Sequence, residues 1–390
     1  MSRDPIAPRV LIAAMLKWYL HHTAKAFEQR DALAGYWVSN ANITGVGNYR
    51  RIWPYHLLKK PFYHLPFVQL EEWTRWLFLP AYDAWLSRQA IPSACNVVMG
   101  PMGSCIPLFD LADRQERGIL KVFDAPNSHP RLHAELWRRE CSEFIPGYEV
   151  PFPDWVVERI SREIEQADLI LCPSDFVKES MVAQGVPPSK CHVRHFGVDT
   201  SIFKPREAVP EKPVFVSVGS VCLRKGHQYL FRAFAKLRET FPHARLICIG
   251  GVRPDFDQEW SLWRDLIEHH PFLPQPRIAE ILQGATAFVL PSVEEGFARV
   301  LSEAMAAGLP LIATHESGAT TVVRNQVEGI IIPSRDIRAL QDAMLLLAKD
   351  QALNRSMGEA ALKAGALRNT WQDYGDNLLE GISQAMAAKS

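Results

Sequence analysis

The chain has 390 residues, too many for one ordinary globular core and suited to two domains of about 150–200 residues each. Apolar residues make up 47% and charged residues 22%, a globular composition that can bury a sizeable core. Lysine plus arginine and aspartate plus glutamate both number 43, so the formal net charge is zero, which argues against a protein that wraps nucleic acid along its whole length.

The seven cysteines are dispersed, and no two of them form a C-x-x-C pair. This spacing argues against zinc-ribbon and thioredoxin-like proteins and is typical of reduced, buried thiols in a cytoplasmic protein. The apolar run at residues 9–15 has the length of a strand, and we do not interpret it as a signal peptide. The sequence has no stretch of about 18 apolar residues, so it predicts no membrane-spanning helix.

Short apolar runs alternate with helical patterns along the first half of the chain. The predicted strands cover residues 9–15, 96–99 and 168–172, and the amphipathic pattern VVERISREIEQA at residues 156–167 predicts a helix. Continuous runs of Val, Ile and Leu are typical of strands that are buried on both faces of a parallel sheet.

A second series of elements begins near residue 213. It has predicted strands at residues 214–219, 245–249, 287–290, 311–314 and 329–332, and predicted helices at residues 226–240, 278–282 and 299–307. Strands that alternate with helices predict a doubly wound, parallel α/β sheet. Two such series predict two Rossmann-like domains that face a central cleft.

The boundary between the two series lies near residues 195–212, which are rich in proline and turn-forming residues. We therefore expect an N-terminal domain over residues 1–200 and a C-terminal domain over residues 201–370. Residues 371–390 are expected to form a helix that packs back on the N-terminal domain. Ligands of such folds bind where strand carboxyl ends and helix N-termini face the cleft.

Two glutamates lie in the stretch PSVEEGFARVLSEAMAAG, which follows the strand predicted at residues 287–290. Glu295 lies in a loop beside Gly296, and Glu303 lies on the helix that follows. A helix N-terminus favours an anionic ligand, carboxylates suit the vicinal hydroxyls of a ribose or sugar, and a glycine lets backbone N–H groups approach a ligand. Either glutamate alone would be a solvated surface residue, whereas the whole string indicates a binding site.

A short basic loop follows the strand predicted at residues 214–219. It delivers Arg224 and Lys225 to the start of the next helix, where two cations and a helix N-terminus favour a diphosphate. An ordinary basic surface loop is the alternative, but this loop lies at the carboxyl end of a strand. The G-x-x-x-x-G-K-[ST] pattern of a P-loop is absent from the sequence.

Four blocks of sequence, taken together, resemble the large family 4 of glycosyltransferases, also called group 1, which has the two-domain GT-B fold. The blocks are ADLILCPSDFVKESMVAQGVPPSKCHVRHFGVDTSIFKP, VSVGSVCLRKG, FVLPSVEEGFARVLSEAMAAGLPLIAT and HESGATTVVRNQVEGIIIP. They cover roughly residues 160–345, and their occurrence in this order is far more specific than any one block.

The resemblance implies a role for each matching residue. Glu303 would hold the nucleotide ribose, Glu295 would contact hydroxyls of the donor sugar, and Lys225 would bind the donor diphosphate. The family usually has an arginine directly after the strand-end glycine, where this chain has Ser220, so we expect Arg224 to supply the second cation. The donor site expected from the resemblance comprises Gly219, Ser220, Arg224, Lys225, Glu295, Gly296, Phe297, Val300 and Glu303.

The N-terminal domain resembles the family less closely, because no Gly-Gly loop follows its first predicted strand. A histidine near the reaction centre is expected from the family, and His129, after the strand-like run KVFD, is the candidate. The alternative is a turn residue before Pro130. With His129, the catalytic group implied by the resemblance is Glu295, Lys225, Arg224 and His129.

The resemblance implies a retaining hexosyltransferase that moves a sugar from a UDP- or GDP-linked donor to a hydroxyl of a glycan or lipid-linked acceptor. Arg224 and Lys225 would stabilise the charge on the leaving diphosphate, so neither a metal ion nor another cofactor is expected. A nucleotide-sugar epimerase and a non-catalytic GT-B binding protein are the alternatives. The presence of Lys225, Glu295 and Glu303 argues against the non-catalytic protein.

Residues 1–100 hold 11 lysines and arginines, 6 aspartates and glutamates and 16 aromatic residues, which are densest over residues 50–85. Basic and aromatic residues together suit an anionic membrane surface or the stacking of sugar rings. The alternative is that the rings fill the core and the cations face solvent. We expect a cytoplasmic protein that associates at most peripherally with the inner face of a membrane and binds no nucleic acid.

Overall fold

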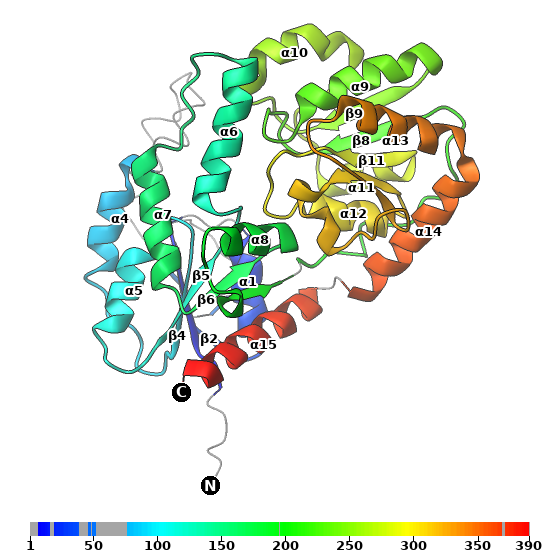
Figure 1. Ribbon diagram of the computed structural model, residues 1–390. Coiled ribbons are helices and arrows are strands. Elements are labelled where there is room, and N and C mark those ends of the chain that lie inside the picture. The colour runs from blue at the N-terminus through cyan, green and yellow to red at the C-terminus, as the bar shows by residue number, and fades with distance from the viewer. Residues whose placement is uncertain are drawn as a thin grey trace.

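The computed structural model describes residues 7–15, 19–38, 46–47, 49–51, 76–194, 196–368 and 371–389. Within these ranges the chain forms two parallel sheets, one in each half, with helices packed around each (Figure 1). The predicted fold class, two doubly wound α/β domains, is therefore confirmed.

The N-terminal sheet has the strand order β3-β2-β1-β4-β5-β6-β7, and every pair of neighbours is parallel. Strand β1 shows why a central strand is apolar along its whole length: Leu11 and Ala13 pack in one apolar core. Val10, Ile12 and Ala14 pack in another core on the opposite face, so the strand is buried on both sides. The strands are β1 (Val10–Ala14), β2 (Leu33–Val38), β3 (Tyr49–Arg51), β4 (Val97–Pro101), β5 (Leu120–Asp124), β6 (Leu169–Cys172) and β7 (Cys191–Val193).

Helices cover both faces of this sheet. One face carries α1 and the C-terminal helix α15, and the other carries the apolar sides of α4, α5 and α7. The helices of this domain are α1 (Leu20–Glu28), α4 (Leu79–Leu86), α5 (Ile106–Asp113), α6 (Pro130–Phe144), α7 (Asp154–Gln166) and α8 (Asp175–Ala183).

The C-terminal sheet has the order β10-β9-β8-β11-β12-β13 and is also parallel throughout. Helices α9 and α13 pack on one face, and α11, α12 and α14 pack on the other. The strands are β8 (Val214–Val218), β9 (Arg245–Ile249), β10 (Glu268–His270), β11 (Ala287–Leu290), β12 (Leu311–Thr314) and β13 (Gly329–Ile332). The helices are α9 (His227–Thr240), α10 (Asp257–Trp263), α11 (Gln275–Gln283), α12 (Val300–Ala306), α13 (Ile337–Lys349) and α14 (Gln351–Arg368). The last helix of the chain, α15 (Trp371–Lys389), packs on the N-terminal sheet.

The strands predicted at residues 245–249, 287–290, 311–314 and 329–332 are confirmed to the residue. Three edge strands were not predicted: β3, β7 and β10 are each three residues long and carry polar side chains. An edge strand has fewer neighbours to bury it, so its sequence lacks the apolar run by which β1, β4 and β6 were recognised.

Two segments connect the domains and lie side by side. Gly197 follows β7, and a Cβ atom added there would lie 2.6 Å from the backbone nitrogen of Trp371, where α15 begins. From this point α15 runs back along the N-terminal domain, and the Tyr374 hydroxyl lies 2.6 Å from Oγ1 of Thr23 on α1. The C-terminal helix is therefore part of the N-terminal domain's packing.

Helix α6 bridges the two domains. Figure 1 shows it rising from the N-terminal sheet along the side of the C-terminal domain. Ala134, near its start, packs in the N-terminal core, whereas Cys141, near its end, packs with residues of the C-terminal core. One helix thus contributes apolar side chains to both domains.

A buried carboxylate fixes the far end of α6. Glu140 is fully buried and accepts hydrogen bonds from Nε2 of Gln228 at 2.7 Å and the hydroxyl of Tyr229 at 2.8 Å, both on α9. It also accepts from Nε of Arg335 at 2.6 Å. These three donors replace the water that the carboxylate loses on burial.

We predict that Glu140→Ala destabilises the protein by about 2–4 kcal/mol, because the change leaves Gln228 and Tyr229 without their acceptor and the partly buried Arg335 without its anionic partner. Glu143→Ala, an exposed glutamate on the same helix, is the control and is expected to change stability little. Chemical denaturation measures both. Equal unfolding midpoints for the two variants would contradict a stabilising contribution of Glu140 to the folded state.

Candidate functional site

The carboxyl ends of β8 and β11 bring two loops of the C-terminal domain together. One loop, residues 219–226, follows β8, and the other, residues 291–299, follows β11. Gly226 has a φ of 75°, and a Cβ atom there would overlap the carbonyl oxygen of Pro291, so only glycine permits this approach. The backbone N–H of Val293 also donates to the carbonyl of Arg224 at 2.9 Å. The predicted basic loop and the predicted glutamate loop are therefore in direct contact.

Lys225 and Glu295 form an ion pair at this junction. Nζ of Lys225 lies 2.5 Å from Oε2 of Glu295, and Nη1 of Arg224 lies 3.4 Å from the same oxygen. Burial opposes ionisation of Glu295, but the charges of Lys225 and Arg224 outweigh it and lower the pKa of Glu295. The structure thus brings together three of the four predicted catalytic residues.

The neighbouring Glu294 is fully buried and binds the N-terminal domain. Its carboxylate accepts hydrogen bonds from the backbone N–H of Ser128 at 3.0 Å and the Ser128 hydroxyl at 2.8 Å. Nδ1 of His133 lies 2.9 Å away, and Nη1 of Arg224 lies 3.1 Å away. Burial again opposes ionisation, but His133 and Arg224 outweigh it and hold the pKa of Glu294 far below its usual value.

Gly296 and Phe297 also contact the N-terminal domain. We expected Gly296 to let backbone groups approach a ligand, but the close approach in the structure is to protein, because a Cβ atom there would overlap the carbonyl oxygen of Pro126. The hydroxyl of Ser174 donates to the Gly296 carbonyl at 2.5 Å. The centre of the buried Phe297 ring lies 6.0 Å from the centre of the Phe196 ring. The loop is therefore fixed both by its backbone at Gly296 and by the side chain of Phe297.

Glu303 lies one turn into α12, whose seven residues begin at Val300. Burial raises the pKa of Glu303, and the charge of Arg299 opposes that shift. Among the described residues, no side chain forms a hydrogen bond with its carboxylate. The helix is two residues shorter than predicted, because Arg299 and Ala307 flank it as its N-cap and C-cap.

His129, the predicted histidine, lies away from the ion pair, and another histidine of the N-terminal domain reaches the C-terminal loops instead. His129 is the N-cap of α6: its Nδ1 accepts from the backbone N–H of Arg131 at 3.3 Å, and its ring lines a cavity beside Lys190, away from the ion pair. Burial lowers the pKa of His129 to about 4. The histidine that reaches the C-terminal loops is His133, through Glu294.

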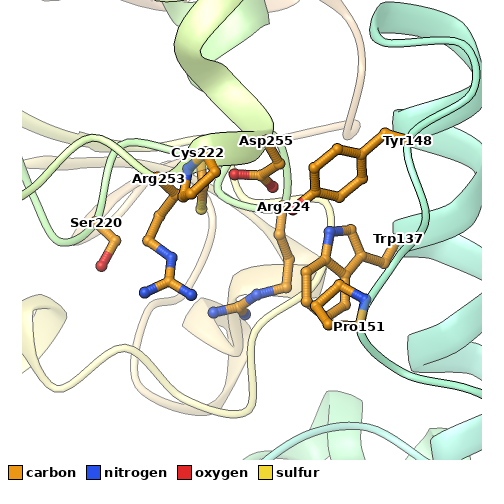
Figure 2. Close-up of a pocket in the computed structure, with 9 residues that line it drawn as sticks. Trp137, Tyr148, Pro151, Ser220, Cys222, Arg224, Arg253 and Asp255 are labelled. Atoms are coloured by element: carbon orange, nitrogen blue, oxygen red, sulfur yellow. The ribbon is translucent and has the colours of Figure 1, made fainter. Parts of the chain in front are cut away.

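A cavity of about 200 Å³ lies between the domains beside these loops. Figure 2 shows the guanidinium groups of Arg224 and Arg253 turned toward each other, with Ser220 on the side of Arg253. Gly219 has a φ of 135° and contacts the side chain of Lys225, since a Cβ atom added at Gly219 would lie 3.1 Å from Nζ of Lys225. On the N-terminal side the cavity is lined by Trp137, Tyr148 and Pro151.

The described members of the aromatic and basic stretch contribute to packing. Trp76 and Tyr82 are buried in the N-terminal core. The guanidinium carbon of Arg50 lies 5.8 Å from the ring centres of Trp37 and of Trp85. Residues 52–75 of this stretch lie outside the described residues, so the membrane hypothesis stays a prediction.

Across the described ranges, no three His, Cys, Asp or Glu side chains are grouped as ligands for a metal ion. The expectation that no metal or cofactor is needed stays a prediction. Of the helices that the structure describes, none has the length and apolar character needed to cross a bilayer.

Three residues of the site were missed by sequence reasoning: Glu294, His133 and Arg253. For Glu294, the only local signal in the sequence was the pair of adjacent glutamates at positions 294–295. His133 and Arg253 stand in no motif, and their positions depend on contacts between the domains or between loops.

Residues 198–364 match the family model described as glycosyl transferases group 1. The D-inositol 3-phosphate glycosyltransferase of Kribbella flavida is 29% identical over 238 residues, or 55% of this chain. The D-inositol 3-phosphate glycosyltransferase 1 of Catenulispora acidiphila is 30% identical over 262 residues, or 60% of this chain. The chain spans 56% and 62% of the length of these two curated relatives.

Two solved structures have the same arrangement over nearly the whole chain. Sucrose-phosphate synthase of Thermosynechococcus elongatus superposes with a TM-score of 0.71 at 17% identity, covering 98% of this chain and 100% of that one. Anabaena HepE, solved with UDP and glucose, gives 0.70 at 13% identity, covering 96% and 99%. These likenesses support the two-domain fold, and the family match supports the motifs of the C-terminal domain. The chain has the GT-B fold, and its residues 198–364 are similar to the group 1 glycosyltransferases.

Proposed function

We propose that the protein is a glycosyltransferase that moves a sugar from a nucleotide-diphosphate sugar to a hydroxyl of an acceptor. The observation that carries this proposal is the convergence of Arg224, Lys225 and Glu295 at adjoining strand ends that face the other domain. The curated relatives are named as glycosyltransferases, and HepE has been solved with UDP-glucose. A UDP-linked sugar is therefore the donor that we propose.

The donor diphosphate would be held by the cations beside β8. Lys225 and Arg224 are the predicted pair, and Arg253 adds a third cation, which lines the same cavity as Arg224. We propose that Arg253 replaces the arginine that the family usually has at the position of Ser220. Planar guanidinium groups bind phosphate oxygens through two parallel hydrogen bonds, which fixes the orientation of the phosphate.

Arg224 is held in place before any ligand contacts it. Its Nη1 donates to the main-chain carbonyl of Glu294 at 2.8 Å and lies 3.1 Å from the Glu294 carboxylate. A fixed, partly buried cation stabilises developing negative charge without reorganising, which is the main electrostatic contribution of many enzymes. As the anomeric C–O bond breaks, its electron pair passes to the diphosphate beside Arg224 and Lys225.

We further propose that the reaction is retaining and independent of metal ions, as the family resemblance implies. The leaving phosphate would accept the proton of the attacking acceptor hydroxyl while the new glycosidic bond forms. Glu303 would bind the ribose hydroxyls and Glu295 those of the donor sugar. A glycan, a lipid-linked sugar or a phosphorylated polyol supplies such an acceptor hydroxyl.

We predict that Lys225→Ala weakens UDP binding by about 10–100-fold, because a charge-assisted hydrogen bond to a phosphate is lost. Isothermal titration calorimetry with UDP measures the effect. Lys236→Ala, an exposed lysine farther along α9, serves as the control and should bind UDP as the unaltered protein does. Equal affinity of the Lys225 and Lys236 variants would argue against this diphosphate site.

Glu303 and Glu295 are expected to act on different parts of the donor. Glu303→Ala should weaken UDP and UDP-glucose equally, by about tenfold, since both ligands contain the ribose. Glu295→Gln should leave UDP binding intact but slow the acceptor-independent hydrolysis of UDP-glucose. The assignment of the two carboxylates is wrong if Glu303→Ala affects UDP-glucose alone or if Glu295→Gln hydrolyses UDP-glucose normally.

A further inference from the structure

A second cavity lies wholly within the N-terminal domain and shares no lining residue with the cavity beside Arg224. Its volume is about 320 Å³, and its walls come from the start of α6, the end of α7 and the segment that joins α8 to β7. Since a water molecule occupies about 30 Å³ of liquid, this space holds roughly ten waters, or one small organic ion in their place.

His129 contributes a hydrogen-bond donor to this cavity. The residue is only 4% exposed, and its Nδ1 accepts from the backbone N–H of Arg131 at 3.3 Å. Burial, with the charge of Arg131 adding to it, lowers the pKa of His129 to about 4, so the ring is neutral at physiological pH. Because Nδ1 is the acceptor, Nε2 carries the proton of the neutral ring. In the part of the chain that the structure describes, no group forms a hydrogen bond with Nε2, so this donor is available to a ligand.

Two cations line the same cavity, Arg131 and Lys190. Nζ of Lys190 donates to the main-chain carbonyl of Ala167 at 2.8 Å, which holds the ammonium in place and leaves it two further N–H groups. Within the described ranges, no carboxylate forms an ion pair with either cation. The lining also includes the exposed carboxylate of Glu165, so two positive charges stand against one negative charge, and the cavity favours an anion.

The donors of this cavity suit a phosphate group. A planar guanidinium binds two phosphate oxygens at once, an ammonium binds as a compact charge, and a neutral N–H adds a third donor. The three terminal oxygens of a phosphate can accept from all three groups, whereas a carboxylate has only two oxygens. The cavity also adjoins the N-terminus of α6, whose partial positive charge favours an anion. The carboxylate of Glu165 would repel a second phosphate, so a single phosphate is favoured over a polyphosphate.

We propose that this cavity is a binding site for a small phosphate-bearing anion, either free phosphate or a phosphomonoester, with Nε2 of His129, Arg131 and Lys190 as the donors. The inference goes beyond the proposed function and does not rest on it, because the cavity shares no residue with the loops assigned to the sugar donor. Free phosphate and a phosphomonoester present the same oxygens, so binding measurements must separate the two.

The variants are chosen to separate ligand binding from the fold. His129→Asn keeps a side chain that caps α6, since asparagine is a preferred N-cap, but its amide is too short to replace the Nε2 donor. Arg131→Ala removes a guanidinium from an exposed position, and Lys190→Gln removes the charge while keeping a donor for the Ala167 carbonyl. Arg162→Ala, an exposed arginine on α7 outside the lining, is the matched control. Thermal unfolding shows whether each variant is folded.

Isothermal titration calorimetry with inorganic phosphate and with glycerol 3-phosphate measures binding to this cavity. The protein is saturated with UDP so that the cations beside β8 are occupied, and the titrations are repeated without UDP on Lys225→Ala. We expect His129→Asn, Arg131→Ala and Lys190→Gln each to weaken binding by about tenfold, the loss of one hydrogen bond to a charged group, and Arg162→Ala to leave it unchanged. The probe that binds more tightly identifies free phosphate or a phosphomonoester as the ligand.

The inference is overturned if neither probe binds in either set of titrations, or if folded His129→Asn and Arg131→Ala both retain the affinity of the protein that lacks these changes. It is also overturned if Arg162→Ala weakens binding as much as Arg131→Ala, because the anion would then respond only to the general charge of the surface. Failure of the proposed function is a separate result. In that case the unaltered protein does not bind UDP, and the titrations on Lys225→Ala without UDP still decide whether the cavity binds phosphate.

Discussion

The candidate site depends on one buried carboxylate, that of Glu294. The residue belongs to a loop of the C-terminal domain, yet Ser128 and His133, which bind it, belong to the N-terminal domain. Moving a carboxylate from water into a protein interior costs several kcal/mol, and that cost is offset here by hydrogen bonds from several fixed donors. Because Arg224 shares the same carboxylate, the position of this cation is coupled to the contact between the domains.

The two adjacent glutamates therefore have different tasks. Glu294 binds the N-terminal domain, and Glu295 binds Lys225. The contact at Glu294 is reinforced at the far end of α6, where Glu140 is held by α9 and by Arg335. A rigid-body opening of the domains would have to break both buried carboxylate contacts, so the cleft at this site is defined by polar contacts as much as by apolar packing.

Much of the fold and half of the site could be predicted from the sequence, for physical reasons. Central strands must be apolar on both faces, and loops at their carboxyl ends carry the glycine and the charges that a phosphate requires, so Lys225 and Glu295 were found from local pattern.

His133 could not be found in this way, because its role comes from a contact with Glu294, which is far away along the chain. His129 was favoured instead, but as an N-cap it has the non-helical dihedrals φ −50° and ψ 137° and directs its ring toward another cavity. Gly296 was predicted to approach a ligand, and its close neighbour in the structure is the Pro126 carbonyl.

The most direct test of this account is a crystal structure of the protein with UDP-glucose. The account predicts that the diphosphate lies against Lys225, Arg224 and Arg253, and that Glu295 moves from Lys225 to the donor sugar. Glu294 should keep its hydrogen bonds to Ser128 and its contact with His133. A diphosphate bound away from Lys225, or a complex in which Glu294 has left the N-terminal domain, would contradict the account.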